Sequence, residues 1–243
     1  MRISATIITL NEERNLPRLL ESLICVDEVL VVDSGSTDRT LEIARRYGAR
    51  VIENPWPGYA KQKNFAATQA THDWILSLDA DEALSDNLGA EILEVKASEP
   101  QVAGYRFPRL AQYLGHWIHH SGWYPDAKVR LYDRRRARWA GDYVHESVQV
   151  EGTVADLSGP LHHFTCASIE EHKRTMERYT TLAADELKAR GYHASLIRLL
   201  LSPPATFLKS YVLQQGFLDG YPGLLIATMA ARYVFLKYAK TRT

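Results

Sequence analysis

The chain has 243 residues, 46% of them hydrophobic and 10% aromatic, so it can bury one full core with a small additional subdomain and is not a disordered polymer. Its formal net charge is zero, and Cys25 and Cys166 are too few and too distant for a disulfide framework or a C-x-x-C metal or redox pair. The opening residues read as a strand without the pattern of a signal peptide, so we expect a cytoplasmic protein.

The first hundred residues alternate between strand and helix patterns. Short apolar runs predict strands over residues 3–9, 28–32, 50–52 and 74–78. Three helices are predicted between them: one carrying Leu16, Leu19, Leu20 and Leu23, one capped by Asp38 or Thr37 and running to Tyr47, and one over 60–70. Repeated strand and helix units predict a parallel sheet that binds ligands at the carboxyl ends of its strands.

A polar cluster follows three of these strands, at residues 9–12, 33–38 and 79–82. In the last cluster, the carboxylates of Asp79 and Asp81 share a face if strand geometry persists, and both can then address a diphosphate or the cation bound to it. An isolated D-x-D can also be a solvated turn, and 34–38 can be a turn that caps a helix. No G-x-G-x-x-G or G-x-x-x-x-G-K-[ST] motif is present, which argues against a dinucleotide fold and a P-loop.

The three clusters, in order, resemble motifs of the family 2 glycosyltransferases with the GT-A fold: T-L-N-E, V-V-D-S-G-S-T-D and W-I-L-S-L-D-A-D-E. The resemblance implies a mainly parallel sheet flanked by helices and an inverting sugar transfer from a nucleotide diphosphate donor, usually a UDP-sugar, aided by Mg²⁺ or Mn²⁺. Its implied site residues are Thr9 and Glu12 in the nucleotide pocket, Asp33 on the uracil ring, Lys63 on donor phosphate, Asp79 by the ribose and Asp81 on the metal. Asn64, beside Lys63, is expected to brace the site.

Sugar transfer also needs a base, because the acceptor hydroxyl must lose its proton. Glu146, within Y-V-H-E-S, resembles in position the acidic base of the family, and Asp126, within W-Y-P-D, is the alternative. The neighbouring His145 is expected to orient or support the site. A second histidine, His163 in L-H-H-F, matches one that recurs in similar bacterial enzymes and can reach the metal or diphosphate, although a structural role is an equal alternative.

Residues 103–165 are less regular and rich in aromatic side chains. Because aromatic faces suit sugar rings, Trp123 and Tyr124 are candidates for acceptor contacts, while the other aromatic residues are expected in the core. Arg130, in K-V-R-L-Y, resembles the R-L-F-type strand of the family and is a third acceptor-side candidate.

The whole chain is similar to a narrower group, the bacterial lipopolysaccharide core β-glucosyltransferases, through residues 170–190, 202–211 and 216–220. This likeness implies a lipid-linked or lipopolysaccharide-type glycan acceptor, and the lack of a Q-x-x-R-W sequence favours a single transfer over polymer synthesis. The predicted domains are a catalytic domain over 1–165, with a nucleotide-sugar half (1–100) and an acceptor half (101–165), and a helical extension over 166–243.

Two other classes of function stay open. A sugar-phosphate nucleotidyltransferase can use a similar sheet and D-x-D, but its glycine-rich basic loop is replaced here by T-L-N-E. A non-catalytic membrane-associated adaptor is the second alternative, and the intact set of acidic residues argues against it.

The C-terminal segment carries most of the positive charge. Residues 190–243 contain seven basic residues and one acidic residue, Asp219, so their net charge is +6. The rest of the chain carries a net charge of −6. Residues 196–218 and 223–240 are apolar on more than one face, but charges interrupt them before about 20 apolar residues accumulate. We therefore expect a peripheral dock on the anionic inner face of the cell membrane rather than nucleic acid binding. Packing within the protein or in a homo-oligomer is the alternative.

Overall fold

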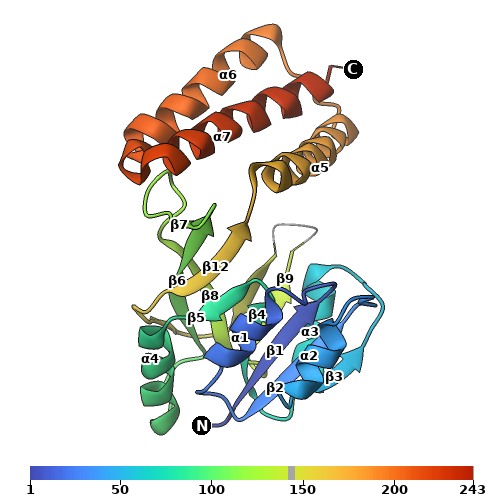
Figure 1. Cartoon of the computed structure of the whole chain (residues 1–243), viewed down its shortest axis with the longest axis vertical. Coiled ribbons are helices and arrows are strands. Elements are labelled where there is room, and N and C mark those ends of the chain that lie inside the picture. The colour runs from blue at the N-terminus through green and yellow to red at the C-terminus, as the bar shows by residue number, and fades with distance from the viewer. Residues whose placement is uncertain (142–145, 243) are drawn as a thin grey trace. The chain divides into compact units, whose positions relative to one another are not determined.

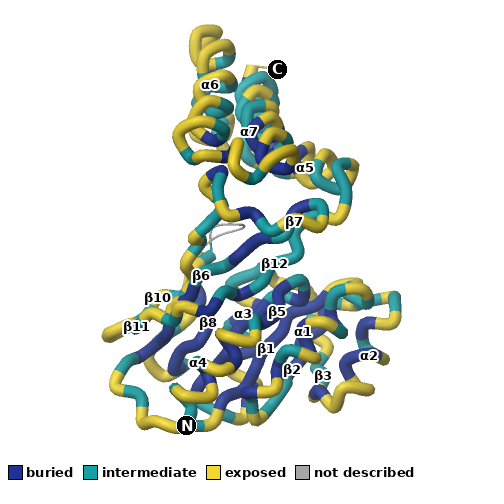
Figure 2. The backbone as a smooth tube through the Cα atoms, turned by 60° about the vertical axis from the view of Figure 1, so that its left-hand side comes forward, coloured by how far each residue is buried: buried dark blue, intermediate teal, exposed yellow. Residues whose placement is uncertain are grey.

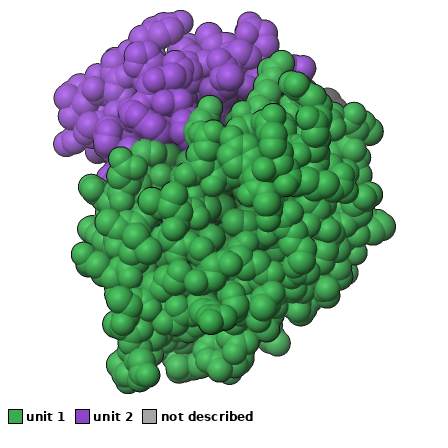
Figure 3. Space-filling view, turned by 60° about the horizontal axis from the view of Figure 1, so that its bottom comes forward, with its two compact units in different colours: residues 1–109, 126–163 green, residues 110–125, 164–243 purple. Residues whose placement is uncertain are grey.

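The computed structural model describes residues 1–141 and 146–242. The chain forms two compact units, shown in different colours in Figure 3: residues 1–109 with 126–163, and residues 110–125 with 164–243. Strands β6 (Gly104–Tyr113) and β12 (Leu161–Cys166) contribute residues to both units. The predicted functional division at residue 165 stays a prediction.

The first unit is built on a mixed sheet with the strand order β3-β2-β1-β4-β8-β6-β12-β5. Its parallel part consists of β1 (Ile3–Thr9), β2 (Glu28–Asp33), β3 (Arg50–Glu53) and β4 (Trp74–Asp79). Next to β4, strand β8 (Asp126–Asp133) runs antiparallel. The shorter strands are β5 (Glu82–Leu84), β7 (His116–Trp117), β11 (Val154–Asp156), and β9 (Ala137–Ala140) paired with β10 (Ser147–Val150).

Helices cover both faces of this sheet (Figure 1). Apolar residues of α1 (Leu16–Ser22), α2 (Thr40–Arg46) and α4 (Asp86–Ala97) pack on one face, and those of α3 (Tyr59–Gln69) pack on the other. Side chains alternate along each strand, so β4 sends Leu76 and Leu78 to the first core and Ile75 to the second. The predicted sheet flanked by helices is confirmed.

The predicted cap of α2 is wrong in detail. The residue at the N-cap position is Arg39, whose side chain caps nothing. Asp38, one residue earlier, accepts hydrogen bonds from the backbone N–H of Thr40 at 3.0 Å and from its hydroxyl. A carboxylate that lies just before a helix can also accept a hydrogen bond from a free N–H group of the first turn. The sequence therefore correctly predicted that Asp38 accepts such a bond, but Asp38 lies one residue before the N-cap position.

The second unit is mainly helical. It contains α5 (Ile169–Ala189), α6 (Leu196–Leu208), a π-helical turn (Lys209–Leu213), a 3₁₀ turn (Gly216–Asp219) and α7 (Gly220–Lys240). Helices α6 and α7 pack together as a hairpin, and Figure 2 shows that α6 is largely exposed. A Cβ on Gly223 of α7 would lie 1.8 Å from the carbonyl oxygen of Gly216, so only glycine fits this approach. Within the described residues, no helix is long and apolar enough to cross a bilayer.

Candidate functional site

The strand register brings the polar clusters of the sequence to one edge of the sheet. Thr9 at the end of β1 pairs with Asp33 at the end of β2, and Ile8 pairs with Asp79 at the end of β4. Because these strands are parallel, the loops that follow them all leave from this edge. The three clusters predicted to form a site are therefore neighbours.

Asp33 shapes the loop after β2. Its buried carboxylate accepts a hydrogen bond from the Thr9 hydroxyl at 2.8 Å, from the backbone N–H groups of Gly35 and Ser36 at 2.9 and 2.7 Å, and from the Ser36 hydroxyl. The protein's own donors thus occupy both carboxylate oxygens. A hydrogen bond from a uracil ring, as predicted for Asp33, requires one of these bonds to be exchanged, and that role stays a prediction.

The loop after β1 is tied to the loop after β2. Asn11, with φ 57°, donates its N–H to the Ser36 hydroxyl and accepts from the Thr37 N–H, each at 2.8 Å. The Glu12 N–H donates to the Thr40 hydroxyl at 2.8 Å. This cross-bracing fixes the backbone on either side of Glu12, which the sequence placed in the donor pocket.

Glu12 shares its surroundings with other carboxylates. Burial raises the pKa of Glu12, its hydrogen bond from Asn15 opposes that rise, and the negative charges of Asp81, Asp38 and Asp79 raise the pKa further. The repulsion means that this edge of the sheet concentrates negative charge. A cation placed there would relieve it.

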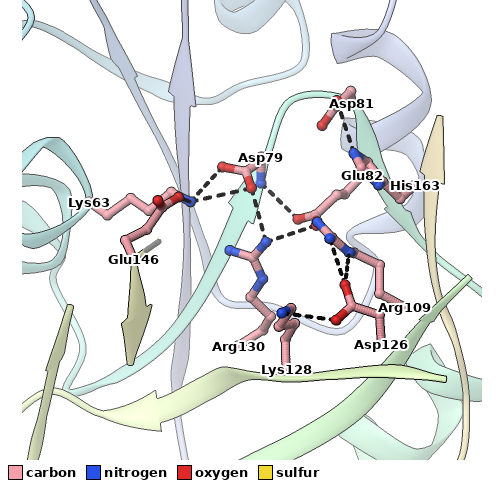
Figure 4. Close-up of polar contacts among 10 residues, drawn as sticks. All are labelled: Lys63, Asp79, Asp81, Glu82, Arg109, Asp126, Lys128, Arg130, Glu146 and His163. Atoms are coloured by element: carbon pink, nitrogen blue, oxygen red, sulfur yellow. Dashed lines mark hydrogen bonds and ion pairs between the residues drawn. The ribbon is translucent and has the colours of Figure 1, made fainter. Parts of the chain in front are cut away.

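Asp79 lies between two buried cations, Lys63 from α3 and Arg130 from β8 (Figure 4). Lys63 Nζ is 2.9 Å from Asp79 Oδ1, and Arg130 Nη2 donates to Asp79 Oδ2 at 2.9 Å. Burial alone would raise the pKa of Asp79, but the positive charges of Lys63 and Arg130, and the hydrogen bonds they donate, hold it well below its ordinary value. Asp79 is therefore ionised at neutral pH and fixed in orientation.

Glu82, at the start of β5, contacts both the backbone of Asp79 and its partner Arg130. Its fully buried carboxylate accepts from Arg130 Nη2 through Oε1 and from the Asp79 N–H through Oε2, both at 2.9 Å. Arg109 Nη1 lies 3.6 Å from the same Oε1. Glu82 thus holds both the backbone of Asp79 and the arginine that neutralises it.

The two candidate bases differ in their surroundings. Asp126 is held by Arg109 Nη2 at 2.6 Å and Lys128 Nζ at 2.9 Å, and although burial would raise its pKa, these two cations lower it. Glu146 contacts Lys63, with Oε1 3.4 Å from Nζ, and its buried Oε2 has no hydrogen-bond partner within residues 1–141 and 146–242. The assignment of the base to Glu146, with Asp126 as the alternative, stays a prediction, and His145 lies outside the described residues.

Asp81 lies close to His163 of β12, with Asp81 Oδ2 3.2 Å from His163 Nε2 (Figure 4). Both side chains are partly exposed, so a ligand can reach them. Across the described part of the chain, no three His, Cys, Asp or Glu side chains form a complete metal site. A metal held here would need further ligands from a diphosphate or water, which is how Mg²⁺ is commonly bound.

The ring of Trp139 in β9 lies against Lys63 and Arg130, the two cations that contact Asp79. Lys63 Nζ lies 4.3 Å and the Arg130 guanidinium 5.2 Å from its ring centroid, both within cation–π range. Asn64 donates to the Trp139 carbonyl at 2.8 Å and accepts from its N–H at 2.9 Å. The expected bracing role of Asn64 is confirmed, and it joins α3 to β9.

Comparison with known proteins shows the family to which the chain belongs. The sequence model of glycosyl transferase family 2 matches residues 4–152, more than half of the chain. The chain belongs to this family. The lipopolysaccharide core biosynthesis glycosyltransferase LpsC of Rhizobium meliloti (strain 1021) is 34% identical over 245 residues, which cover 98% of this chain and 91% of LpsC.

Two further comparisons agree with this assignment. An uncharacterized glycosyltransferase of Rickettsia typhi (strain ATCC VR-144 / Wilmington) is 34% identical, with 99% of this chain and 87% of the relative covered. The mannosyltransferase PcManGT from Pyrobaculum calidifontis, solved with GDP-Man and Mn²⁺, matches with a TM-score of 0.56 at 15% identity and covers 99% of this chain and 86% of its own. The predicted GT-A fold is confirmed, and this family 2 enzyme is a glycosyltransferase.

Other predicted acceptor contacts are less directly supported. Trp123 and Tyr124 belong to the second unit, where Trp123 packs edge-on against Tyr113 and Tyr124 against His119, with centroids 5.7 Å apart in each pair. Their contact with an acceptor stays a prediction. The buried Arg130 contacts Asp79 and Glu82 through Nη2, and its predicted contact with an acceptor also stays a prediction.

The sequence did not predict that Glu82, Arg109 and Trp139 belong to the site. Glu82 was visible as the third acidic residue of D-A-D-E, but nothing in the sequence shows that it turns inward while Asp81 stays accessible. The other two reach the site through antiparallel pairing and a separate two-stranded ribbon. Such long-range pairings leave no local periodicity to detect.

Proposed function

We propose that this family 2 glycosyltransferase moves one sugar, with inversion, from a nucleotide diphosphate donor to a lipid-linked or lipopolysaccharide-type glycan. We favour a UDP-hexose as donor and Mg²⁺ or Mn²⁺ as the metal. The observation that carries the proposal is the pairing of a neutralised, fixed Asp79 with Glu146, whose buried Oε2 lacks a partner among the described residues. The acceptor class follows from LpsC, which is named for lipopolysaccharide core biosynthesis.

The residues present fit a divalent metal. Carboxylate and imidazole groups are suitable ligands for Mn²⁺, and Asp81 and His163 offer one of each at a partly exposed position. The repulsion that raises the pKa of Glu12 also favours a cation near Asp81. The metal would neutralise the charge that develops on the leaving diphosphate. The structural neighbour PcManGT was solved in complex with GDP-Man and Mn²⁺, which supports a divalent metal here.

The protein's own groups account for the remaining steps. A new bond forms between the acceptor oxygen and the anomeric carbon as the bond from that carbon to the diphosphate oxygen breaks. The hydroxyl proton passes to Glu146, whose Oε2 has no hydrogen-bond partner among the described residues. Lys63 contacts both Asp79 and Glu146 and so keeps the two carboxylates near each other. Its contact with donor phosphate is part of the proposal. Thr9, Glu12 and Asp33 would bound the nucleotide.

The enzyme would work at the cytoplasmic face of the cell membrane, where lipid-linked acceptors are available. The net charge of +6 from Arg190 to the end supports a peripheral contact with anionic lipid.

A donor screen tests the proposal. Purified protein is incubated with UDP-glucose, UDP-galactose, UDP-N-acetylglucosamine or GDP-mannose, with Mn²⁺ or with a chelator, and release of the nucleoside diphosphate is measured. We expect one UDP-sugar to be cleaved only with metal. Preference for GDP-mannose would correct the donor, and metal-independent cleavage would remove the role of Asp81.

A further inference from the structure

The outward side of helix α6 is apolar. Its exposed large side chains include Ile197, Leu200 and Leu201, which are 71%, 67% and 63% exposed, and also Leu196 and Leu208. None of the residues of α6 is buried. Monomeric proteins rarely leave such a contiguous apolar surface uncovered, so this face is expected to contact something.

The apolar residues occupy one side of the helix. At about 100° per residue, positions 196, 197, 200, 201 and 208 fall within less than half a turn of the helix circumference. The half-buried Leu199 and Thr206 lie on the other side, and α6 packs against α7. The arrangement is the reverse of an ordinary surface helix, because the apolar side faces outward.

Basic residues border this face. Arg198 and Lys209 are both exposed, and they are separated by about three helical turns, so they lie along the same border. The single acidic residue between 191 and 242, Asp219, has a buried carboxylate that binds the backbone N–H groups of His119 and His120. The exposed charge of this segment is therefore positive.

We propose that the outward face of α6 lies in the plane of an anionic membrane, with its leucines among the acyl chains and Arg198 and Lys209 at the lipid phosphates. A helix of this pattern, too short and too charged to cross, suits the interface of a bilayer. An antiparallel, two-fold symmetric contact between the α6 helices of two copies is less favourable, because it would bring the positive charges of Arg198 and Lys209 in the two copies close together. The inference deepens the proposed membrane association and stands independently of donor and metal.

Flotation of the purified full-length protein with lipid vesicles tests the inference. We expect binding to vesicles that contain about 30% phosphatidylglycerol, little binding to pure phosphatidylcholine, and a loss of binding as NaCl rises from about 0.05 to 0.5 M. Leu200→Gln with Leu201→Gln should weaken binding by at least about tenfold, since two leucines lose their apolar burial. Arg198→Gln and Lys209→Gln should each weaken it about fivefold.

Ile24→Gln is the control, because Ile24 is an apolar residue of the first unit that is 80% exposed, more than either leucine, and its change should leave binding intact. Donor cleavage by the α6 variants should stay normal, which separates this inference from the proposed function and shows that the variants fold. Absence of vesicle binding at low salt would overturn the inference. So would a dimer in sedimentation velocity that Leu200→Gln with Leu201→Gln converts to monomer.

Discussion

Among the single residues of the site, the carboxylates differ in the cations that they contact. Asp126 is neutralised by Arg109 and Lys128, and Asp79 by Lys63 and Arg130, so both remain ionised and bind protons poorly. Glu146 contacts Lys63, which it shares with Asp79, and its charge also interacts with that of Arg130. We propose Glu146 as the proton acceptor because its Oε2 has no hydrogen-bond partner among the described residues.

Glu146→Gln should lower kcat by about 10² or more while donor affinity is retained, because glutamine keeps the shape of the side chain but cannot take the proton. Asp126→Asn should lower kcat much less. Steady-state kinetics on both variants, with donor binding measured separately, checks the assignment. The reverse ranking would make Asp126 the base.

Glu82 is expected to matter for both stability and donor binding. Glu82→Gln removes the buried negative charge that faces Arg130 and Arg109, while it can keep one hydrogen bond to the Asp79 N–H. We expect a loss of about 1–3 kcal/mol in the free energy of unfolding and weaker donor binding. Denaturant unfolding and nucleotide titration measure the two effects. Asp156→Asn, which breaks the exposed pair with Arg106, is the control and should be nearly neutral. An unchanged Glu82→Gln protein would contradict the positioning role.

At the scale of elements, the parallel half of the sheet was predictable and the antiparallel half was not. Strands β1, β2 and β4 are buried, and their continuous apolar runs identify them in the sequence. Strands β5 and β11 are three residues long, too short to show a period. Arg109 and Asp126 meet because β6 pairs antiparallel with β8, a contact that depends on the tertiary fold.

Glu28 of β2 links neighbouring elements and makes stability depend on pH. It accepts hydrogen bonds from the Ser4 hydroxyl of β1, from Arg50 of β3 and from the Thr71 N–H and hydroxyl. Burial on its own would raise the pKa of Glu28, but the Ser4 hydroxyl, Thr71 and Arg50 lower it from 4.5 to about 2. Because the folded pKa is depressed, the stabilisation is complete above pH 4.5 and is lost as the pH falls toward 2.

Glu28→Gln should therefore lower the free energy of unfolding at pH 7 by about 1–2 kcal/mol, a figure reduced for solvent screening, and the difference from the native protein should shrink between pH 4.5 and 2. Urea unfolding at several pH values measures it. Glu99→Gln, at an exposed position, serves as control. If the difference in the free energy of unfolding does not change with pH, the destabilisation by Glu28→Gln comes from altered packing and not from the charge of Glu28.

At the scale of the whole molecule, charge is divided along the chain. Residues 1–189 carry −6 and residues 190–243 carry +6. The acidic part contains the carboxylates that suit a metal and a nucleotide diphosphate, and the basic part contains the exposed apolar face of α6. The two parts are thus suited to different partners, a small anionic donor with its cation and an anionic lipid surface.

In the proposed reaction, Asp81 couples a divalent metal to a nucleotide diphosphate. Isothermal titration calorimetry with UDP and GDP, with and without Mn²⁺, measures this coupling on the native protein and on Asp81→Asn. We predict that Mn²⁺ strengthens binding of one nucleotide by at least about tenfold in the native protein and has little effect in Asp81→Asn, while Asp156→Asn behaves like the native protein. Equal Mn²⁺ dependence in the native protein and Asp81→Asn, or no nucleotide binding by the native protein under either condition, would contradict a role of Asp81 in metal-dependent donor binding.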